Sequence, residues 1–316
     1  MSKVISIGNT CLDIVLSYAD QLPNWNSELL FRQSEWRLGG QGANFAIASA
    51  NLALQQILIS SVGNDYVGDR LSSELASAIP IHKRLFRCEE SETGFTVSLI
   101  RKDGERLFLT FLGHQNTFSL THMMNDILAI VEMDDIVHFS GVYNLPGLKR
   151  ELTSVTKRLE RAGARISFDP GWNPDNFSKR TREEFYGILS HVDFYEPNDA
   201  ELRQLAGETN VDLAALGVKR RYEGVLVVKL GKYGSKVFDS SHRVTAVRSY
   251  RTSVADTTGA GDVFDAGLIA GIIHNRNLEF SARFGNAAAS IAISRRGTPK
   301  HRFPKYPEVR RLIGTL

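Results

Sequence analysis

Cysteine is scarce in this chain of 316 residues, which contains only Cys11 and Cys88. Two cysteines are too few for a disulfide scaffold or for a zinc site built from cysteine, and they favour a reducing cytoplasm. No apolar run reaches the ~18 residues that a membrane-spanning helix needs. The chain also enters a strand-like pattern within its first residues, so we expect neither a secretory signal nor a membrane partner.

Two common nucleotide-binding motifs are absent as well. No G-x-G-x-x-G follows the first apolar run, which disfavours a nicotinamide-binding enzyme, and no G-x-x-x-x-G-K-[ST] loop occurs. The formal net charge is only +3 and the charged residues are scattered, so the sequence predicts no nucleic-acid partner. This mild positive charge does suit a small anionic ligand.

An alternation of short apolar runs and amphipathic stretches fills most of the chain. Runs typical of buried strands cover 4–7, 57–62, 136–139, 165–168, 192–195 and 225–229. Stretches typical of helices cover 43–53, 68–78, 120–131, 147–162, 182–190 and 200–206. This order predicts an α/β fold with a mainly parallel sheet between two layers of helices. The chain exceeds the ~250–300 residues at which single cores stop growing, so we expect an appendage or a second domain.

Two extended segments interrupt the alternation. Residues 95–112 contain two period-2 runs separated by Asp103-Gly104, a strong hairpin signal, because glycine accepts the positive φ of a tight turn. Residues 12–38 carry aromatic side chains among polar ones and also look extended. We expect these two segments to form a small separate sheet, whose exposed edge favours a homodimer. Residues 236–247 predict a further hairpin in the main body.

The strongest chemical signal is Gly259-Ala260-Gly261-Asp262, a turn of small residues that runs into an apolar helix expected at 262–274. The first N–H groups of a helix have no partner inside the helix, and the helix dipole adds positive potential there. The turn therefore predicts an anion hole suited to phosphate. Asp262 can accept a proton from an attacking hydroxyl, and we expect the dipole to keep it ionised. The alternative is a glycine-rich loop with an aspartate N-cap.

Two features near the N-terminus suit the recognition of hydroxyl groups. Gly39, Gly40 and Gly42 precede or open an alanine-rich helix, and Asn44 can both donate and accept hydrogen bonds. Asp13 follows the first strand and can grip vicinal hydroxyls with both carboxylate oxygens. The alternatives are a plain loop or hinge for the glycines and a turn residue for Asp13.

Two further motifs follow strand ends, at the edge of the sheet where α/β proteins bind ligands. Asn198 and Glu201 lie three residues apart on one helix face, where they can hold waters around Mg²⁺. The alternative is a capping box formed by the same two residues, and both functions are compatible. Lys229 precedes a glycine turn, with Gly231 and Gly234, that can face a nucleotide or simply lead into a hairpin.

In this order the motifs resemble the signatures of the ribokinase-like (PfkB) carbohydrate kinases, a family that includes nucleoside kinases. The resemblance rests on Gly39-Gly40-Gln41-Gly42-Ala43-Asn44, Asn198-Asp199-Ala200-Glu201, Gly231-Lys232-Tyr233-Gly234 and Asp256-Thr257-Thr258-Gly259-Ala260-Gly261-Asp262. It covers nearly the whole chain, so residues 1–316 are expected to form one kinase domain with lid segments at about 12–38 and 95–112. It implies a three-layer α/β/α body with a small β-sheet lid, which often forms a dimer interface in the family.

The resemblance implies ATP-dependent phosphorylation of a hydroxyl group, usually a primary alcohol of a sugar. By match, Asp262 is the general base. The backbone implied to stabilise the transferring phosphoryl group is that of Gly259, Ala260 and Gly261. The residues implied to hold the sugar are Asp13, Gly39, Gly40 and Asn44.

The resemblance also implies the cofactors. The residues expected to bind the nucleotide are Asn198, Lys229, Gly231, Gly234 and Asn286. Those expected to organise Mg²⁺ through water are Asn198 and Glu201. Asp256 and the backbone of Thr258 match positions that bind a monovalent cation in potassium-activated members, so K⁺ is a further candidate.

Departures from the family pattern bear on the substrate. Gln41 stands where many ribokinases and phosphosugar kinases have lysine, which weakens the case for an anionic substrate. Cys11 stands where ribokinase has an asparagine on its sugar, and the strand end 138–141 lacks a carboxylate that ribokinase has there. The polar lid segment 112–116 can read the substrate, and we interpret its His114 as a surface-loop residue rather than a ligand.

An unphosphorylated sugar is therefore the expected substrate. A nucleoside or phosphosugar kinase of the same family is the nearest alternative. A catalytically silent ligand-binding protein is the alternative from a different class.

Overall fold

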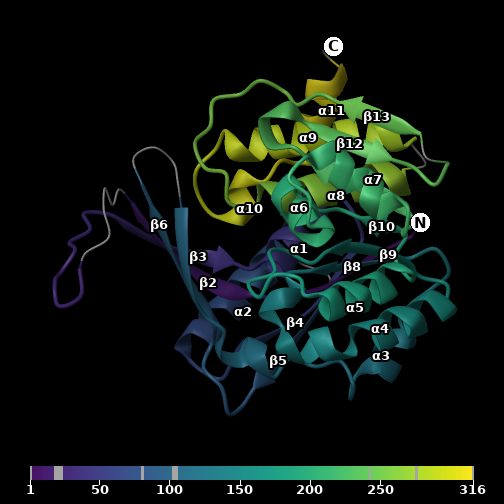
Figure 1. Ribbon diagram of the computed structural model, residues 1–316. Helices are drawn as coiled ribbons and strands as arrows, with labels where there is room; N and C mark the ends of the chain where they lie inside the picture. The colour runs from purple at the N-terminus through teal and green to yellow at the C-terminus, as the bar shows by residue number, and fades with distance from the viewer. Residues whose placement is uncertain are drawn as a thin grey trace.

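A large, mainly parallel sheet forms the middle layer of the molecule (Figure 1). The computed structural model describes residues 2–17, 24–79, 82–101, 106–241, 243–274 and 277–314. In these ranges the sheet contains β1 (Val4–Gly8), β4 (Gln56–Gly63), β5 (His82–Cys88), β8 (Ile136–Ser140), β9 (Arg165–Asp169), β10 (Phe194–Tyr195), β11 (Val225–Lys229), β12 (Ser235–Phe238) and β13 (Val244–Val247). Their order in space is β13-β12-β11-β10-β9-β8-β1-β4-β5. Neighbours from β11 to β5 are parallel, and β12 and β13 form an antiparallel hairpin at one edge.

Helices cover both faces of this sheet (Figure 1). On one face lie α3 (Met124–Leu128), α4 (Pro146–Arg161), α5 (Lys179–Leu189), α6 (Asp199–Ala206) and α7 (Val211–Lys219), which share an apolar core with the sheet. On the other lie α1 (Gln41–Asn51), α2 (Tyr66–Ala78), α8 (Ala260–Ile273), α9 (Leu278–Ile293), α10 (Pro299–Arg302) and α11 (Tyr306–Gly314), most of them around a second core. The predicted three-layer α/β/α body is confirmed.

The element pattern differs from the sequence prediction in a few places. The predicted strand 192–195 shortens to the two residues of β10, and the predicted helix 120–131 forms an α-helix only in α3. The pattern did not predict β5, because its sequence HKRLFRC is dominated by basic residues. Such charge is typical of an edge strand, which must not pair with other chains. In the described part of the chain, none of the helices is both long and apolar enough to cross a membrane.

The lid is a second sheet beside the body (Figure 1). Its strands follow the order β3 (Ser34–Gly39), β2 (Cys11–Ser17), β6 (Phe95–Ile100) and β7 (Arg106–Phe111). β6 and β7 pair antiparallel, as predicted, and the turn Asp103-Gly104 lies outside the described residues. A parallel pairing of β2 with β6 joins the two extended segments into one sheet. Phe108 and Leu109 on the edge strand β7 are about half exposed, and a homodimer through the lid stays a prediction.

Glycines bring α8 and α9 into close contact on the face that carries the late motif. A Cβ on Gly267 would lie 2.8 Å from the Cα of Gly285, and a Cβ on Gly271 would lie 2.6 Å from the Cα of Ser281. A side chain at either position would push the two helices apart. The contact therefore fixes the position of α8, and with it the turn at 259–261.

We expect Gly267→Ala to lower the free energy of unfolding by about 1–3 kcal/mol, because the new methyl group overpacks the α8–α9 contact. Gly217 in α7 is the matched control, since a Cβ there meets nothing within 4 Å. Gly217→Ala is expected to be neutral or to stabilise by up to ~1 kcal/mol. Urea denaturation measures both, and equal effects of the two substitutions would contradict the packing argument.

Candidate active site

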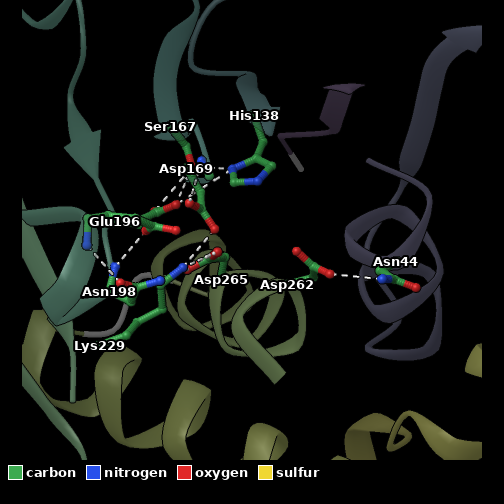
Figure 2. A network of polar contacts seen from close by, with 11 residues as sticks. Asn44, His138, Ser167, Asp169, Glu196, Asn198, Lys229, Asp262 and Asp265 are labelled. Atoms are coloured by element: carbon green, nitrogen blue, oxygen red, sulfur yellow. Dashed lines mark hydrogen bonds and ion pairs between the residues drawn. The ribbon is translucent and has the colours of Figure 1, made fainter. Parts of the chain in front are cut away.

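A buried ion network joins the ends of β9 and β11 to helix α8 (Figure 2). The ammonium of Lys229, at the end of β11, lies 2.7 Å from Oδ2 of Asp169, at the end of β9. It lies 2.9 Å from Oδ2 of Asp265 on α8. Burial alone would lower the pKa of Lys229, but these two carboxylates raise it well above its ordinary value. The ammonium therefore stays charged at the edge of the sheet where ligands bind α/β proteins.

A hydrogen-bonded cluster of fully buried side chains adjoins this network. Oγ of Ser167 lies 2.6 Å from Nδ1 of His138 and 3.0 Å from Oε2 of Glu196. Burial lowers the pKa of His138 to about 3 and raises that of Glu196 to about 8. His138, Glu196 and Asp265 lie close enough together to share a metal ion. However, Lys229 already neutralises Asp265, and Glu196 is protonated at neutral pH because its pKa is about 8. The cluster therefore fits a core network that holds no metal ion.

The predicted anion hole lies at the start of α8. Gly259 is the N-cap residue and has φ of 72°, a left-handed conformation that strains any residue with a side chain. A Cβ on Gly261 would lie 3.5 Å from Nζ of Lys229, so the ammonium borders the bare backbone of the turn. The N–H of Ala260 donates to the carbonyl oxygen of Thr257 (3.2 Å). The turn thus combines a helix N-terminus with a fixed positive charge, and both favour an anion.

Asp262, in the first turn of α8, is 5% exposed and accepts a hydrogen bond from Nδ2 of Asn44 (2.9 Å). Figure 2 shows it between Asn44 and the Lys229 network. Burial raises the pKa of Asp262 to about 7, the charge of Asp169 adds to this, and the bond from Asn44 opposes it. The expectation that the helix dipole keeps this carboxyl ionised is therefore only partly met near neutral pH, because desolvation outweighs the dipole.

The predicted sugar-binding residues Asp13, Gly39 and Gly40 lie where the lid meets the body. A Cβ on Gly39 would lie 2.2 Å from Cγ of Asp13, so glycine at this position leaves room for the carboxyl. Burial raises the pKa of Asp13 to about 6, against the attraction of Arg37. Gly40 has φ of 94°, and a Cβ on it would lie 2.5 Å from the carbonyl oxygen of Asn9.

Asn44 links this region to the late motif, because it lies on α1, which Gly40 caps, and bonds to Asp262. Two turns of the chain that are far apart in sequence therefore come together at one place. Gln41 opens α1, and its Oε1 lies 2.5 Å from the position of a Cβ on Gly171. Its amide thus reaches the loop after β9, beside the ends of the strands.

A cavity of about 640 Å³ lies beside the start of α8, and four of the five predicted nucleotide-binding residues line it. These four are Lys229, Gly231, Gly234 and Asn286. Ala260 and Gly261 form part of the same wall, so the cavity is continuous with the anion hole. Its volume falls in the range of ~300–1,000 Å³ that is usual for ligand pockets.

Asn198 and Glu201 form the capping box that the sequence offered as the alternative for this pair. Oδ1 of Asn198 accepts the N–H of Glu201, and Oε2 of Glu201 accepts the N–H of Asn198 (2.9 Å each). Burial raises the pKa of Glu201 to about 7. Because Oε1 of Glu201 and the side-chain NH₂ of Asn198 are not needed for the box, the pair also fits the water shell of a magnesium ion.

Asp256 and Thr258, the residues matched to a monovalent-cation site, contact two arginines. Nη1 of Arg37 and Nη1 of Arg302 each lie 2.6 Å from Oδ2 of Asp256. Nη2 of Arg302 donates to the carbonyl oxygen of Thr258. These guanidinium groups hold the pKa of Asp256 far below its ordinary value.

Sequence reasoning missed four residues of this site. Asp169 had a signal, since it follows a predicted strand directly and so lies at the ligand-binding edge of the sheet. The only sequence signal for Asp265 was its spacing, since it lies one helical turn beyond Asp262. Arg37 and Arg302 had no local signal, because the lid and the segment after α9 bring them to the site.

The interpretation of His114 as a surface-loop residue is wrong. Its side chain is fully buried, and its Nδ1 accepts the N–H of Gly94 (2.9 Å). Burial lowers the pKa of His114 to about 4. A neutral imidazole that fixes the start of β6 explains the residue better than exposure, which polar neighbours in the sequence had suggested.

Comparison with known proteins agrees with this geometry. The family model of the pfkB family carbohydrate kinases matches residues 1–303. The chain belongs to this family. The protein is therefore a sugar or nucleoside kinase of the pfkB family.

The relatives differ in the substrates after which they are named. A nucleoside kinase of Methanothermobacter thermautotrophicus is 26% identical over 297 residues, which are 93% of this chain and 90% of the relative. An ATP-dependent ribose-1-phosphate kinase of Halopiger xanaduensis is 27% identical and is covered to 94%, as is this chain. The structure of Arabidopsis thaliana ribokinase complexed with ribose and ATP superposes with a TM-score of 0.83 at 22% identity, covering 99% of both chains. The last comparison shows that the fold is shared.

For this pfkB-family kinase we expect kcat/KM to rise with pH through an acid limb near pH 7. A general base must be deprotonated in the free enzyme, and burial raises the pKa of Asp262 to about 7. In Asn44→Leu the charged form loses its hydrogen-bond donor, so the limb moves to higher pH while the rate at neutral pH falls. A pH profile of coupled ADP release measures both. A limb that stays near pH 4 in both proteins would exclude this carboxyl as the titrating base.

Proposed function

We propose that this kinase transfers the γ-phosphoryl group of ATP to a hydroxyl group, a primary alcohol, of an unphosphorylated sugar. The observation that carries the proposal is the placement of Asp262. A buried carboxyl with a pKa near neutrality lies within one helical turn of bare backbone, and a fixed ammonium borders that backbone. The carboxyl is suited to take a proton, and the turn is suited to hold the phosphoryl group that replaces it.

In the proposed step the carboxylate of Asp262 accepts the proton of the sugar hydroxyl while that oxygen bonds to the γ-phosphorus. The bond from phosphorus to the β–γ bridging oxygen breaks, and ADP leaves with its electron pair. The transition state is loose and needs little early proton transfer, so a base with a pKa near 7 is adequate.

Charge on the transferring phosphoryl oxygens is stabilised by the start of α8. The first N–H groups of a helix have no partner inside it, so those at the start of α8 can donate to these oxygens, and the ammonium of Lys229 borders Gly261 and adds its charge. Ala260 gives its N–H to Thr257 and maintains the turn. Losing one such donor costs about 10²–10³ in rate in enzymes that use oxyanion holes.

ATP fits the cavity beside α8, with its base among Gly231, Gly234 and Asn286 and its phosphates directed to the turn. Asn198 and Glu201 would hold the waters of Mg²⁺, which neutralises phosphate charge when it is bound. We place the acceptor sugar beside Asp13, Gly39, Gly40 and Asn44, because Asn44 contacts Asp262.

A neutral acceptor is favoured because carboxyl groups and amides surround its place. Asp13 and Asp262 repel an anion, and Gln41 offers no positive charge. The guanidinium groups of Arg37 and Arg302 are already paired with Asp256. A nucleoside stays the second candidate, since the relative from Methanothermobacter is named a nucleoside kinase and an uncharged nucleoside meets the same requirement.

We expect Asp262→Asn to lower kcat by about 10²–10⁴ while ATP binding is kept, because the variant removes a positioned base. The control is Asp212→Asn, which changes an exposed carboxyl in the first turn of α7. Asp262→Asn is also expected to fold. Burial raises the pKa of Asp262 from its ordinary value to about 7, so the wild type loses stability as pH rises between those two values and the amide does not. Turnover near that of the wild type would refute the base assignment.

Thermal-shift screening with a non-hydrolysable ATP analogue tests the acceptor class. Neutral sugars or nucleosides are expected to raise Tm, because a ligand at 100 times its Kd increases the free energy of unfolding by about 2.7 kcal/mol. Phosphosugars are not expected to raise it. Gln41→Lys supplies a cation beside the ends of β8 and β9, and we expect it to gain a response to phosphosugars. A wild-type response confined to phosphosugars would overturn the proposed acceptor class.

A further inference from the structure

Two buried arginines meet at the loop that leads into α8. Arg37 lies on the lid strand β3 and is 3% exposed, and Arg302 ends α10 and is 2% exposed. Each places Nη1 at 2.6 Å from Oδ2 of Asp256. Such close, buried guanidinium–carboxylate pairs are held by geometry and are not easily opened.

The same arginines occupy the oxygens of Thr258. Nη2 of Arg37 donates to its Oγ1 (3.0 Å), and Nη2 of Arg302 donates to its carbonyl oxygen (2.5 Å). The other carboxylate oxygen of Asp256, Oδ1, accepts the N–H of Thr258 (2.9 Å). The carboxylate and carbonyl oxygens that a cation would need in this loop therefore already accept N–H groups.

These residues do not fit a monovalent metal ion. An ion of this kind is bound by oxygen lone pairs, and here guanidinium groups use them. Two permanent positive charges next to the same oxygens would repel it, since arginine is not deprotonated in proteins. An ion that displaced either arginine would leave a buried charge without its partner, which is strongly unfavourable.

We propose that Arg37 and Arg302 together act as a built-in cation that replaces a monovalent metal ion, so that phosphoryl transfer by this kinase needs no K⁺. The proposal rests on the proposed function. Both arginines are positioning residues, which hold Asp256 and Thr258 directly ahead of the anion-hole turn. Nη2 of Arg302 lies 3.5 Å from the position of a Cβ on Gly259, so it also supports the N-cap of α8.

The arrangement differs from a bound metal ion in its consequences. Its charge cannot dissociate, and half of it comes from the lid, where Arg37 is two residues before Gly39. The lid strand is therefore joined to the phosphoryl-binding turn by the same group that supplies the charge. Asp13 lies opposite Arg37 in the register of β2 and β3, which brings the proposed sugar side of the site next to the same charges.

The first test uses the wild-type protein, with ATP as its tetramethylammonium salt and constant ionic strength. Turnover in KCl, NaCl and tetramethylammonium chloride is expected to agree within about twofold, since no ion has to bind. Tm and thallium-205 NMR are the readouts without turnover, and neither should show a saturable response to K⁺ or Tl⁺. Saturable activation by K⁺, or a Tm increase specific to K⁺, would overturn the proposal.

The second test removes half of the built-in cation with Arg302→Ser. We expect its rate in tetramethylammonium chloride to fall about 10-fold to 100-fold, because small displacements of a catalytic turn have effects of this size. K⁺ should restore part of the rate and raise Tm, and Arg302→Lys should need no K⁺. Arg221→Ser is the control, since Arg221 pairs with Glu183 at the surface.

The outcomes separate the two proposals. A folded Arg302→Ser with the wild-type rate in every salt would refute the role of the arginine. Should this variant fail to fold, the wild-type comparison decides alone. Should the protein phosphorylate no sugar or nucleoside, the proposed function fails, and the Tm and thallium measurements still decide whether a monovalent ion binds.

Discussion

The pairing of Lys229 with Asp169 and Asp265 is the interaction on which the site depends. It joins the ends of β9 and β11, which flank β10 in the sheet, to the first turns of α8. All three side chains are largely shielded from water. Removing one partner from a buried ion pair costs about 3–5 kcal/mol, because the remaining charge has no solvent to stabilise it. The start of α8 is therefore held against the strand ends, and the ammonium remains next to Gly261.

This constraint also determines the chemistry of Asp262. The network concentrates carboxyl groups in a dry space, and the negative charge of Asp169 makes the ionisation of a further carboxyl unfavourable. The single hydrogen bond from Asn44 offsets part of that effect. The result is a carboxyl whose pKa lies near neutrality, within one helical turn of the bare backbone at residues 259–261. The same burial that suits this carboxyl to the proposed role of base reduces the stability of the fold when it ionises.

The small lid sheet contributes side chains to the candidate site. Strand β3 ends at Gly39, whose missing side chain gives room to the Asp13 carboxyl, and it carries Arg37 to the loop before α8. The segment after α9 meets it there through Arg302. Two parts of the chain that are remote in sequence thus converge on Asp256, and the proposed sugar and phosphoryl sides of the site share one charge array.

Much of this was readable in the sequence. The order of apolar and amphipathic segments determined the layered α/β body, and the glycine turns determined where bare backbone and helix starts occur, because both depend on local periodicity and local conformation. Only the tertiary structure decided which charges meet. Arg37, Arg302 and Asp169 are ordinary polar residues in their own surroundings, and His114 even resembles a surface residue. Their places in the candidate site arise from burial and from partners at a distance along the chain, and neither pKa shifts nor ion pairs of this kind are encoded in a local pattern.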